Sequence, residues 1–113
     1  MPLPCCDVII PARNAAATLP DAISSVLAQT ALDLRLIVVD DGSTDGTATI
    51  VRAFATGDAR VSLLRQPGLG IAAAMNAGLR AGHSDFVARL DADDISAPDR
   101  HARQLRYLAE NPG

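Results

Sequence analysis

The hydrophobic positions of this chain fall into two alternating patterns. Short, mainly apolar runs predict four strands, at residues 8–10, 34–39, 61–64 and 86–90. The segments between the runs have apolar residues every three or four positions, and this period is typical of helices. Strands and helices that alternate through short loops predict an α/β fold, with a parallel sheet covered by helices through right-handed crossovers.

Capping and breaking residues mark the ends of the helices. The first predicted helix has Thr18 at its N-cap and Pro20 in its first turn. The other three are bounded near 43–45 and 57–58, at Gly70 and Gly82, and at 98 and 111. The third carries large apolar residues four positions apart, a spacing typical of a helix: Ile71, Met75 and Leu79.

Composition narrows the class of protein. The 113 residues are 49% hydrophobic and 20% charged, as expected of a single globular domain. Lys and Arg number 10 against 13 Asp and Glu, for a net charge of -3, and aromatic residues make up only 3%. The chain therefore lacks both the basic surface and the stacking residues that nucleic-acid binding needs.

The sequence also indicates where the protein is found in the cell and which role its two cysteines have. No apolar run approaches the roughly 20 residues of a membrane span, and residues 1–6 do not resemble a signal peptide, so we expect a cytoplasmic protein. Cys5 and Cys6 are adjacent, which rules out an ordinary disulfide between them. We interpret them as small apolar residues where the first strand begins.

Polar residues gather where the predicted strands end, at 11–14, 40–43 and 91–94. Ligands bind at the carboxyl ends of the strands in open parallel sheets, so these segments predict one shared site. The five aspartates of the last two segments would repel one another at this edge. Such a grouping is least costly when a cation lies among the carboxylates.

The Asp91-Ala92-Asp93 triplet is the candidate metal site. Residues i and i+2 of an extended chain face the same side, so both carboxylates can point into the cleft. Mg²⁺, and similarly Mn²⁺, is held by one or two carboxylates together with substrate phosphates. The alternative is an acidic loop that caps the fourth helix near Asp94.

Asp40 and Asp41 suggest a different role, the recognition of a nucleoside. A carboxylate at a strand end can accept a hydrogen bond from a ribose hydroxyl or a base N–H. Asp-Gly-Ser is also strong turn chemistry, and both readings hold if Asp40 builds the turn while Asp41 faces the ligand. Arg13 can offset ligand charge or stack on a base, or it can be a solvated loop residue.

The chain resembles family 2 glycosyltransferases. The resemblance rests on four segments in the family's order, residues 8–14, 38–45, 70–78, and 89–94 with 98–100. It implies a Rossmann-like GT-A fold, a nucleotide-sugar donor that is commonly a UDP-sugar, and transfer with inversion to a glycan, lipid or other hydroxyl acceptor.

The resemblance also implies roles for individual residues. Asp41 would contact the uracil, and Asp91 and Asp93 would form the Asp-x-Asp motif that binds Mg²⁺ or Mn²⁺. The residues expected to bind the nucleotide sugar are Pro11, Ala12, Arg13, Asn14, Asp40, Asp41, Asn76, Asp91 and Ala92. Many relatives carry Arg where this chain has Met75, so a polar contact from that position is lost.

The chain ends at Gly113, before the part of the family domain that normally supplies the general base and the acceptor pocket. We therefore expect residues 1–113 to be the donor-binding part of a GT-A domain, truncated after its fourth βα unit, with the catalytic base beyond Gly113. The whole protein could lie at the membrane periphery. An open edge along residues 86–90 would favour a homodimer.

Three rival interpretations remain at this stage. Residues 68–73 match the G-x-G-x-x-A dinucleotide fingerprint, with Asp91 at about the required spacing of 20 residues, but they follow the third strand instead of the first. A phosphoryl-receiver domain would need its acidic pair after the first strand and a late lysine, and the chain has no lysine. A folded module that binds the donor without transferring the sugar is the third.

Overall fold

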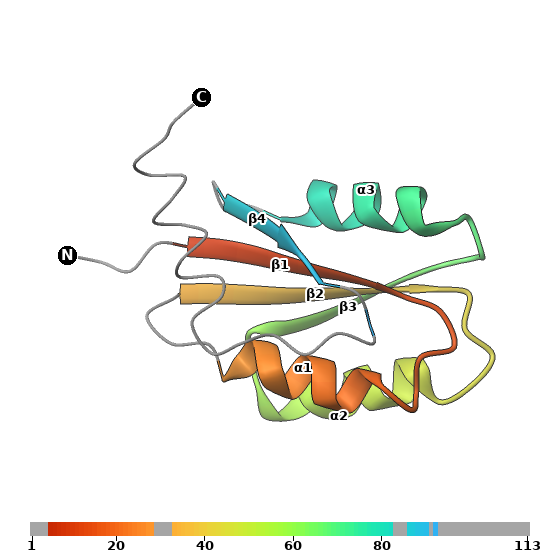
Figure 1. Ribbon diagram of the computed structural model, residues 1–113, viewed down its shortest axis with the longest axis horizontal. Helices are drawn as coiled ribbons and strands as arrows, with labels where there is room; N and C mark the ends of the chain where they lie inside the picture. The colour runs from red at the N-terminus through yellow and green to blue at the C-terminus, as the bar shows by residue number, and fades with distance from the viewer. Residues whose placement is uncertain (1–4, 29–32, 83–85, 91, 93–113) are drawn as a thin grey trace.

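The computed structural model describes residues 5–28, 33–82, 86–90 and 92. In these residues strands and helices alternate as predicted, and each of the first three strands is longer than its apolar run (Figure 1). The elements are β1 (Cys5–Ala12), α1 (Leu19–Leu27), β2 (Asp33–Asp41), α2 (Thr47–Gly57), β3 (Val61–Gln66), α3 (Ile71–Ala81) and β4 (Phe86–Arg89). The fourth predicted helix, 98–111, lies outside the described residues.

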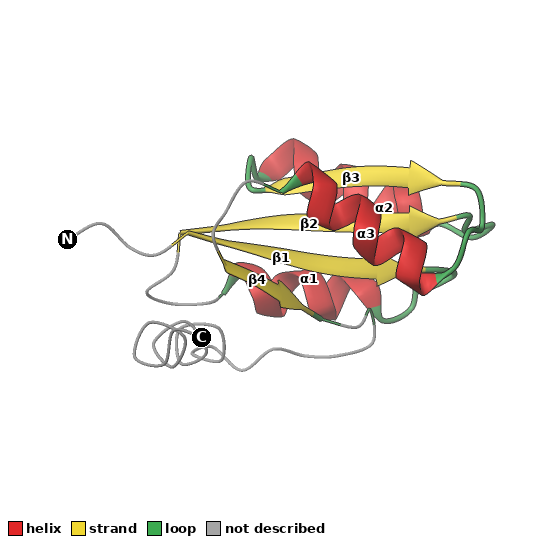
Figure 2. Cartoon of the chain, turned by 90° about the horizontal axis from the view of Figure 1, so that it is seen from above, coloured by secondary structure: helices red, strands yellow, loops and turns green. Residues whose placement is uncertain are grey.

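The four strands form one parallel sheet in the order β3-β2-β1-β4. The chain moves from β1 outward to β3 and then returns to place β4 on the other side of β1. Because the direction reverses, right-handed crossovers require α3 to cover the opposite face from α1 and α2, as Figure 2 shows. The switch in strand order falls between β1 and β4, which is where ligands bind in open α/β sheets.

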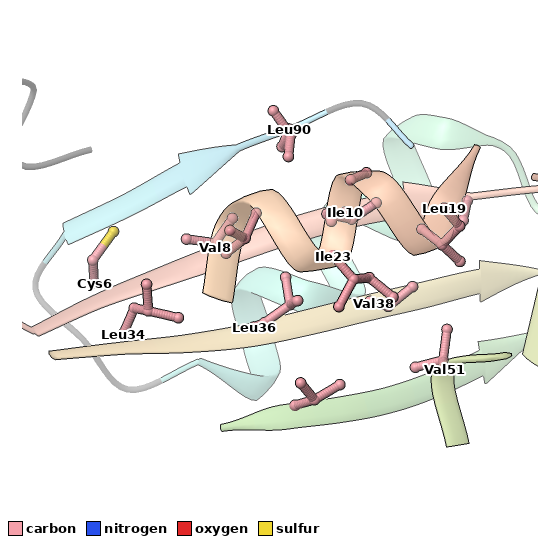
Figure 3. Packing of buried hydrophobic residues seen from close by; sticks show 14 residues of the cluster. Cys6, Val8, Ile10, Leu19, Ile23, Leu34, Leu36, Val38, Val51 and Leu90 are labelled. Atoms are coloured by element: carbon pink, nitrogen blue, oxygen red, sulfur yellow. The ribbon is translucent and has the colours of Figure 1, made fainter. Parts of the chain in front are cut away.

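The larger core lies between the sheet and helices α1 and α2. Alternate residues of β1 and β2 face these helices, among them Val8, Ile10 and Leu36, all fully buried. Figure 3 shows them packed with Leu19 and Ile23 of α1. Burying a side chain of this size stabilises the fold by about 1.5–3 kcal/mol, so this cluster is the main source of stability in the described chain.

The core under α3 is smaller than the core under α1 and α2. Ile71 is 59% exposed and Leu79 is 45% exposed, whereas Met75 packs against this smaller core. The helix also packs through its small residues Ala74 and Gly78, both buried against the sheet. A Cβ on Gly78 would lie 2.6 Å from Ile9 Cγ2, so only a stripe of small residues allows this close approach.

The helix starts differ in detail from the predicted caps. Thr18 occupies the N-cap of α1, but its hydroxyl donates to the carbonyl oxygen of Ala15, 3.5 Å away, and does not cap the helix. Helix α2 begins at Thr47, after the predicted start, because the Asp45 carboxylate accepts the Thr47 backbone N–H at 3.0 Å. Carboxylates near a helix start are also favoured by the helix dipole.

Of the two adjacent cysteines, Cys6 is confirmed as a small core residue. It is a free thiol, buried in the core below α1. Burial, reinforced by the negative charge of Asp7, raises the pKa of the Cys6 thiol to about 11. A thiol with this pKa is inert at neutral pH. None of the helices within the described ranges has the length and apolar character needed to cross a membrane.

Candidate active site

A pocket of about 600 Å³ opens at the carboxyl end of the sheet, at the switch in strand order. This volume is within the range of about 300–1,000 Å³ common for small-molecule sites. The pocket is lined by Pro11, Ala12, Arg13, Asn14, Ala15, Thr18, Asp41, Gly70, Ile71, Arg89 and Ala92. Three strand ends and the start of α3 therefore contribute to one cavity.

The pocket brings together most of the residues predicted to bind a nucleotide sugar. Pro11, Ala12, Arg13, Asn14, Asp41 and Ala92 all line it. Asp40 and Asn76 are not among the lining residues: Asp40 is buried on the other face of the sheet, and Asn76 is exposed on α3. Asp91 and Asp93 lie outside the described residues.

Asn14 joins the loop after β1 to the loop after β2. Its backbone takes a positive φ of 50°, which asparagine tolerates better than most residues. Its side-chain carbonyl accepts the Thr44 backbone N–H at 2.8 Å, and its own backbone N–H donates to Ser43 Oγ at 2.9 Å. The predicted ligand residue Asn14 therefore also has a structural role.

A second set of hydrogen bonds continues this junction. The Ala15 backbone N–H donates to Thr47 Oγ1 at 3.0 Å, and the Ala16 N–H donates to Asp45 Oδ2 at 3.2 Å. The Thr47 hydroxyl in turn donates to Asp45. This hydrogen bond is the main reason that the pKa of Asp45 lies below its usual value. The loops after β1 and β2 are thereby fixed to each other beside the pocket.

Asp40 builds the turn after β2, as predicted. Its carboxylate is fully buried, and Oδ1 accepts the Ser43 backbone N–H at 3.1 Å. Oδ2 makes no hydrogen bond within the described residues, but Arg65 Nε of the neighbouring strand lies 3.3 Å away and forms an ion pair with it. The positive charge compensates a carboxylate that would otherwise be costly to bury.

Asp41 points to the opposite face and holds the loop between β3 and α3. Its Oδ1 accepts from Gln66 Nε2 at 2.8 Å and from the Leu69 N–H at 2.7 Å. Its Oδ2 accepts from the Gly70 N–H at 3.0 Å. The Gln66 hydrogen bond, followed by the two backbone bonds and the charge of Arg13, holds the pKa of Asp41 below its usual value against the effect of burial.

Gly42 allows the loop after β2 to approach the β3–α3 loop closely. It has a φ of 74°, and a Cβ there would lie only 2.6 Å from the backbone nitrogen of Gly68. A side chain at this position would be strained by its backbone and would also push the β3–α3 loop away. The Asp-Gly sequence after β2 therefore sets the position of the loop that Asp41 holds.

Sequence reasoning overlooked five lining residues, Ala15, Thr18, Gly70, Ile71 and Arg89. Arg89 lies opposite Ile9 in the β1–β4 register, so it shares the α3 face of the sheet with Asp41. Alternation along β4 could have identified it, because Ala88 packs into the core on the other face. With Arg13, Arg89 gives the pocket two positive charges suited to an anionic ligand.

Of the predicted Asp91-Ala92-Asp93 metal site, Ala92 is the residue that the structure describes. Among the described residues, no group of three or more His, Cys, Asp or Glu side chains could hold a metal ion. Ala92 does line the pocket, and it is the central residue of the predicted Asp-x-Asp motif. The carboxylates that precede and follow it in the sequence are of a type suited to Mg²⁺ or Mn²⁺.

Solved structures share this fold. A mannosyltransferase, PcManGT from Pyrobaculum calidifontis in complex with GDP-Man and Mn²⁺, superposes with a TM-score of 0.82 at 30% identity, over 94% of this chain and 32% of that chain. TarS of S. aureus, residues 1–349 in complex with UDP-GlcNAc, has a TM-score of 0.78 at 23% identity, over 93% of this chain and 31% of that chain. The architecture is that of the GT-A glycosyltransferases, as the resemblance implied.

Comparison of sequences also identifies relatives of this chain. Succinoglycan biosynthesis protein ExoU of Rhizobium meliloti is 40% identical over 110 residues, which are 92% of this chain and 32% of that protein. An uncharacterized glycosyltransferase of Haemophilus influenzae is 38% identical over 112 residues, 98% of this chain and 45% of that protein. The chain thus spans less than half the length of these relatives. The model of glycosyl transferase family 2 matches residues 7–113, so the chain belongs to this family.

Proposed function

We propose that this chain is the donor-binding part of a glycosyltransferase that moves a sugar from a UDP-sugar to an acceptor hydroxyl. The observation that carries the proposal is the pocket at the switch in strand order, where Asp41 lies with Arg13 and Arg89. A carboxylate that accepts from a base and two arginines that offset phosphate charge are the complement of a nucleoside diphosphate. The GDP-Man and Mn²⁺ bound by PcManGT support the same class of donor.

The hydrogen bonds of Asp41 favour a uracil base. A carboxylate has about four positions that accept hydrogen bonds, and three of them are filled by Gln66, Leu69 and Gly70. Among the described residues nothing fills the remaining position, on Oδ2 of a residue that lines the pocket. Uracil offers one ring N–H, whereas guanine offers two adjacent donors that a free carboxylate would bind together. A single open position therefore suits uridine better than guanosine.

Asp91 and Asp93 are proposed to hold Mg²⁺ or Mn²⁺ at the diphosphate. When bound, the ion stabilises negative charge on the leaving diphosphate. Arg13 and Arg89 add positive charge on the pocket wall. The acceptor oxygen forms a bond to the anomeric carbon while the carbon–oxygen bond to the diphosphate breaks, which inverts the configuration. A general base takes the hydroxyl proton, and we assign this role to none of the described residues.

Calorimetry of UDP and several UDP-sugars, with and without Mn²⁺, tests this function. We expect binding that Mn²⁺ strengthens and that Asp41→Asn weakens at least tenfold, because a charged acceptor is lost. Asp21→Asn removes the same charge from an exposed position on α1 and should bind as the wild type does. A folded wild-type sample that binds no nucleotide would overturn the proposal. Binding without transfer by the full-length protein would identify the inactive module instead.

A further inference from the structure

We propose that Gln66 is a positioning residue for the donor, which fixes the Asp41 carboxylate that receives the base. The inference rests on the proposed function and adds a residue that does not itself line the pocket but forms hydrogen bonds to Asp41 and Gly70, which do. Gln66 ends β3 directly opposite Asp41 in the β2–β3 register. Its Nε2 donates to Asp41 Oδ1 at 2.8 Å and lies 3.5 Å from the Gly70 carbonyl oxygen.

The orientation of the Gln66 amide follows from its neighbours. Both groups near it, an ionised carboxylate and a backbone carbonyl, can only accept hydrogen bonds. The amide must therefore turn its NH₂ group toward them. One NH₂ group can serve both acceptors at once, so Gln66 connects Asp41 to the residue at which helix α3 begins.

Among the described residues, Gln66 is the only side chain that donates to Asp41. The other two donors are backbone N–H groups of Leu69 and Gly70, which belong to the loop that Asp41 itself holds in place. These two bonds come from one loop, whose position also depends on the close approach of Gly42 to Gly68. The strand residue Gln66 adds support from a different element, and among the described residues Oδ2 keeps one open position for a ligand.

Two arginines lie near this pair among the described residues. Arg13 lies close enough to lower the pKa of Asp41, and Arg89 lines the same pocket. Asp40 and Arg65 pair with each other on the opposite face of the sheet. The wild type and a Gln66→Glu variant differ in one titratable group, the residue introduced at position 66, so a pH-dependent difference in binding between them reports on that residue.

Gln66→Glu tests positioning through a pH profile. At pH 8 the new carboxylate cannot donate and repels Asp41, so we expect UDP binding at least tenfold weaker than in the wild type. Two adjacent carboxylates share a proton readily, so at about pH 5.5 the protonated carboxyl should donate to Asp41 in place of the amide. Binding should then recover. The ratio of variant to wild-type affinity at each pH cancels the titration of UDP itself.

Two further variants complete the experiment. Gln66→Met keeps the length of the side chain without a donor, and we expect weak binding at every pH with no recovery. Ala53→Glu places the same charge on the exposed face of α2 and should follow the wild type. Circular dichroism at each pH identifies folded samples. Wild-type affinity in both Gln66 variants, or an affinity ratio for Gln66→Glu that does not change with pH, would overturn positioning. A wild type that binds no UDP would instead overturn the proposed function.

Discussion

Asp40 and Asp41 are neighbours in the chain, yet their carboxylates lie on opposite faces of the sheet and hold different loops. Asp40 accepts the Ser43 N–H on the side of α1 and α2. Asp41 accepts from the β3–α3 loop on the side of α3. The alternation of side chains along a strand produces this division. One strand end therefore organises the loops on both sides of the sheet.

Removing the Asp40 carboxylate should destabilise the fold. Asp40→Ala leaves the Ser43 N–H without its acceptor and Arg65 without its partner. We expect a loss of about 1–3 kcal/mol in the free energy of unfolding, measured by urea denaturation. Asp21→Ala, at an exposed position in the first turn of α1, should cost at most about 1 kcal/mol. Equal losses in the two variants would contradict the role assigned to Asp40.

Asn14 combines a positive φ with hydrogen bonds to the β2–α2 loop, and two substitutions separate these effects. Asn14→Gly relieves the backbone but removes the side-chain acceptor of the Thr44 N–H. Asn14→Ala removes the acceptor and adds a backbone penalty of roughly 1–2 kcal/mol. Thermal unfolding should therefore rank the wild type as most stable, then Asn14→Gly, then Asn14→Ala. An alanine variant as stable as the glycine variant would show that the backbone of this loop relaxes.

Gly78 sets the distance between α3 and β1. Gly78→Ala places a methyl group 2.6 Å from Ile9 Cγ2, and overpacking of this kind costs about 1–3 kcal/mol. The control is Gly57→Ala at the end of α2, where a Cβ meets nothing within 4 Å and alanine should be neutral or stabilising.

A second variant tests the cause of this cost. Ile9→Val keeps Cγ2 but removes Cδ1, which would lie 3.2 Å from the new methyl group. Combined with Gly78→Ala, it should recover part of the lost unfolding free energy, so that the two changes are not additive. Strict additivity in urea denaturation would place the strain elsewhere.

Stability should depend on pH in the acid range. Hydrogen bonds hold the pKa values of Asp41, Asp45 and Asp58 below their usual range, from Gln66, Thr47 and Arg60 respectively. A carboxyl with a lowered pKa in the folded state stabilises the fold fully above the pKa of the unfolded chain, about 3.9. These contributions are lost as the pH falls through the lower folded values.

Urea denaturation should therefore give constant contributions from these groups between pH 5 and 8 and a decline below about pH 4. Asp45→Asn should make the decline shallower, because one of the three groups no longer titrates. A fold that becomes more stable as the pH falls from 5 to 3 would contradict the direction of these shifts.

The predicted homodimer would form along the edge of β4. Among the described strands, β4 pairs with β1 alone, and the Leu90 N–H donates to the Ile9 carbonyl. Alternate N–H groups of β4 therefore face away from the sheet. We predict association that increases with concentration in light scattering, and that Val87→Lys weakens by placing charge on the exposed edge. A wild type that stays monomeric at millimolar concentration would refute it.

Strand positions and the site loops could be predicted because their signals are local. Apolar runs mark buried strands, and the polar segments 11–14 and 40–43 directly follow β1 and β2. Parallel strands bring such segments to one edge without further information. Most of the pocket-lining residues were therefore accessible to sequence reasoning.

The face of α3 was not predictable in this way. Ile71 and Leu79 are the large apolar residues, but the distance between helix and sheet decides which stripe packs, and Gly78 allows the close approach. Likewise, the contact between Asp41 and Gln66 joins residues 25 positions apart, through strand register. Neither signal is present in any short stretch of the chain.

The hydrogen bonds between residues 14–16 and 43–47 also determine how these loops exchange amide protons with solvent. Three of the N–H groups, those of Asn14, Ala15 and Ala16, are bound to side chains of the opposite loop. Surface loops normally exchange within the shortest times. Because these hydrogen bonds join the two loops, we expect the three amides to exchange only when the loops separate, as one unit with the strand ends that carry them.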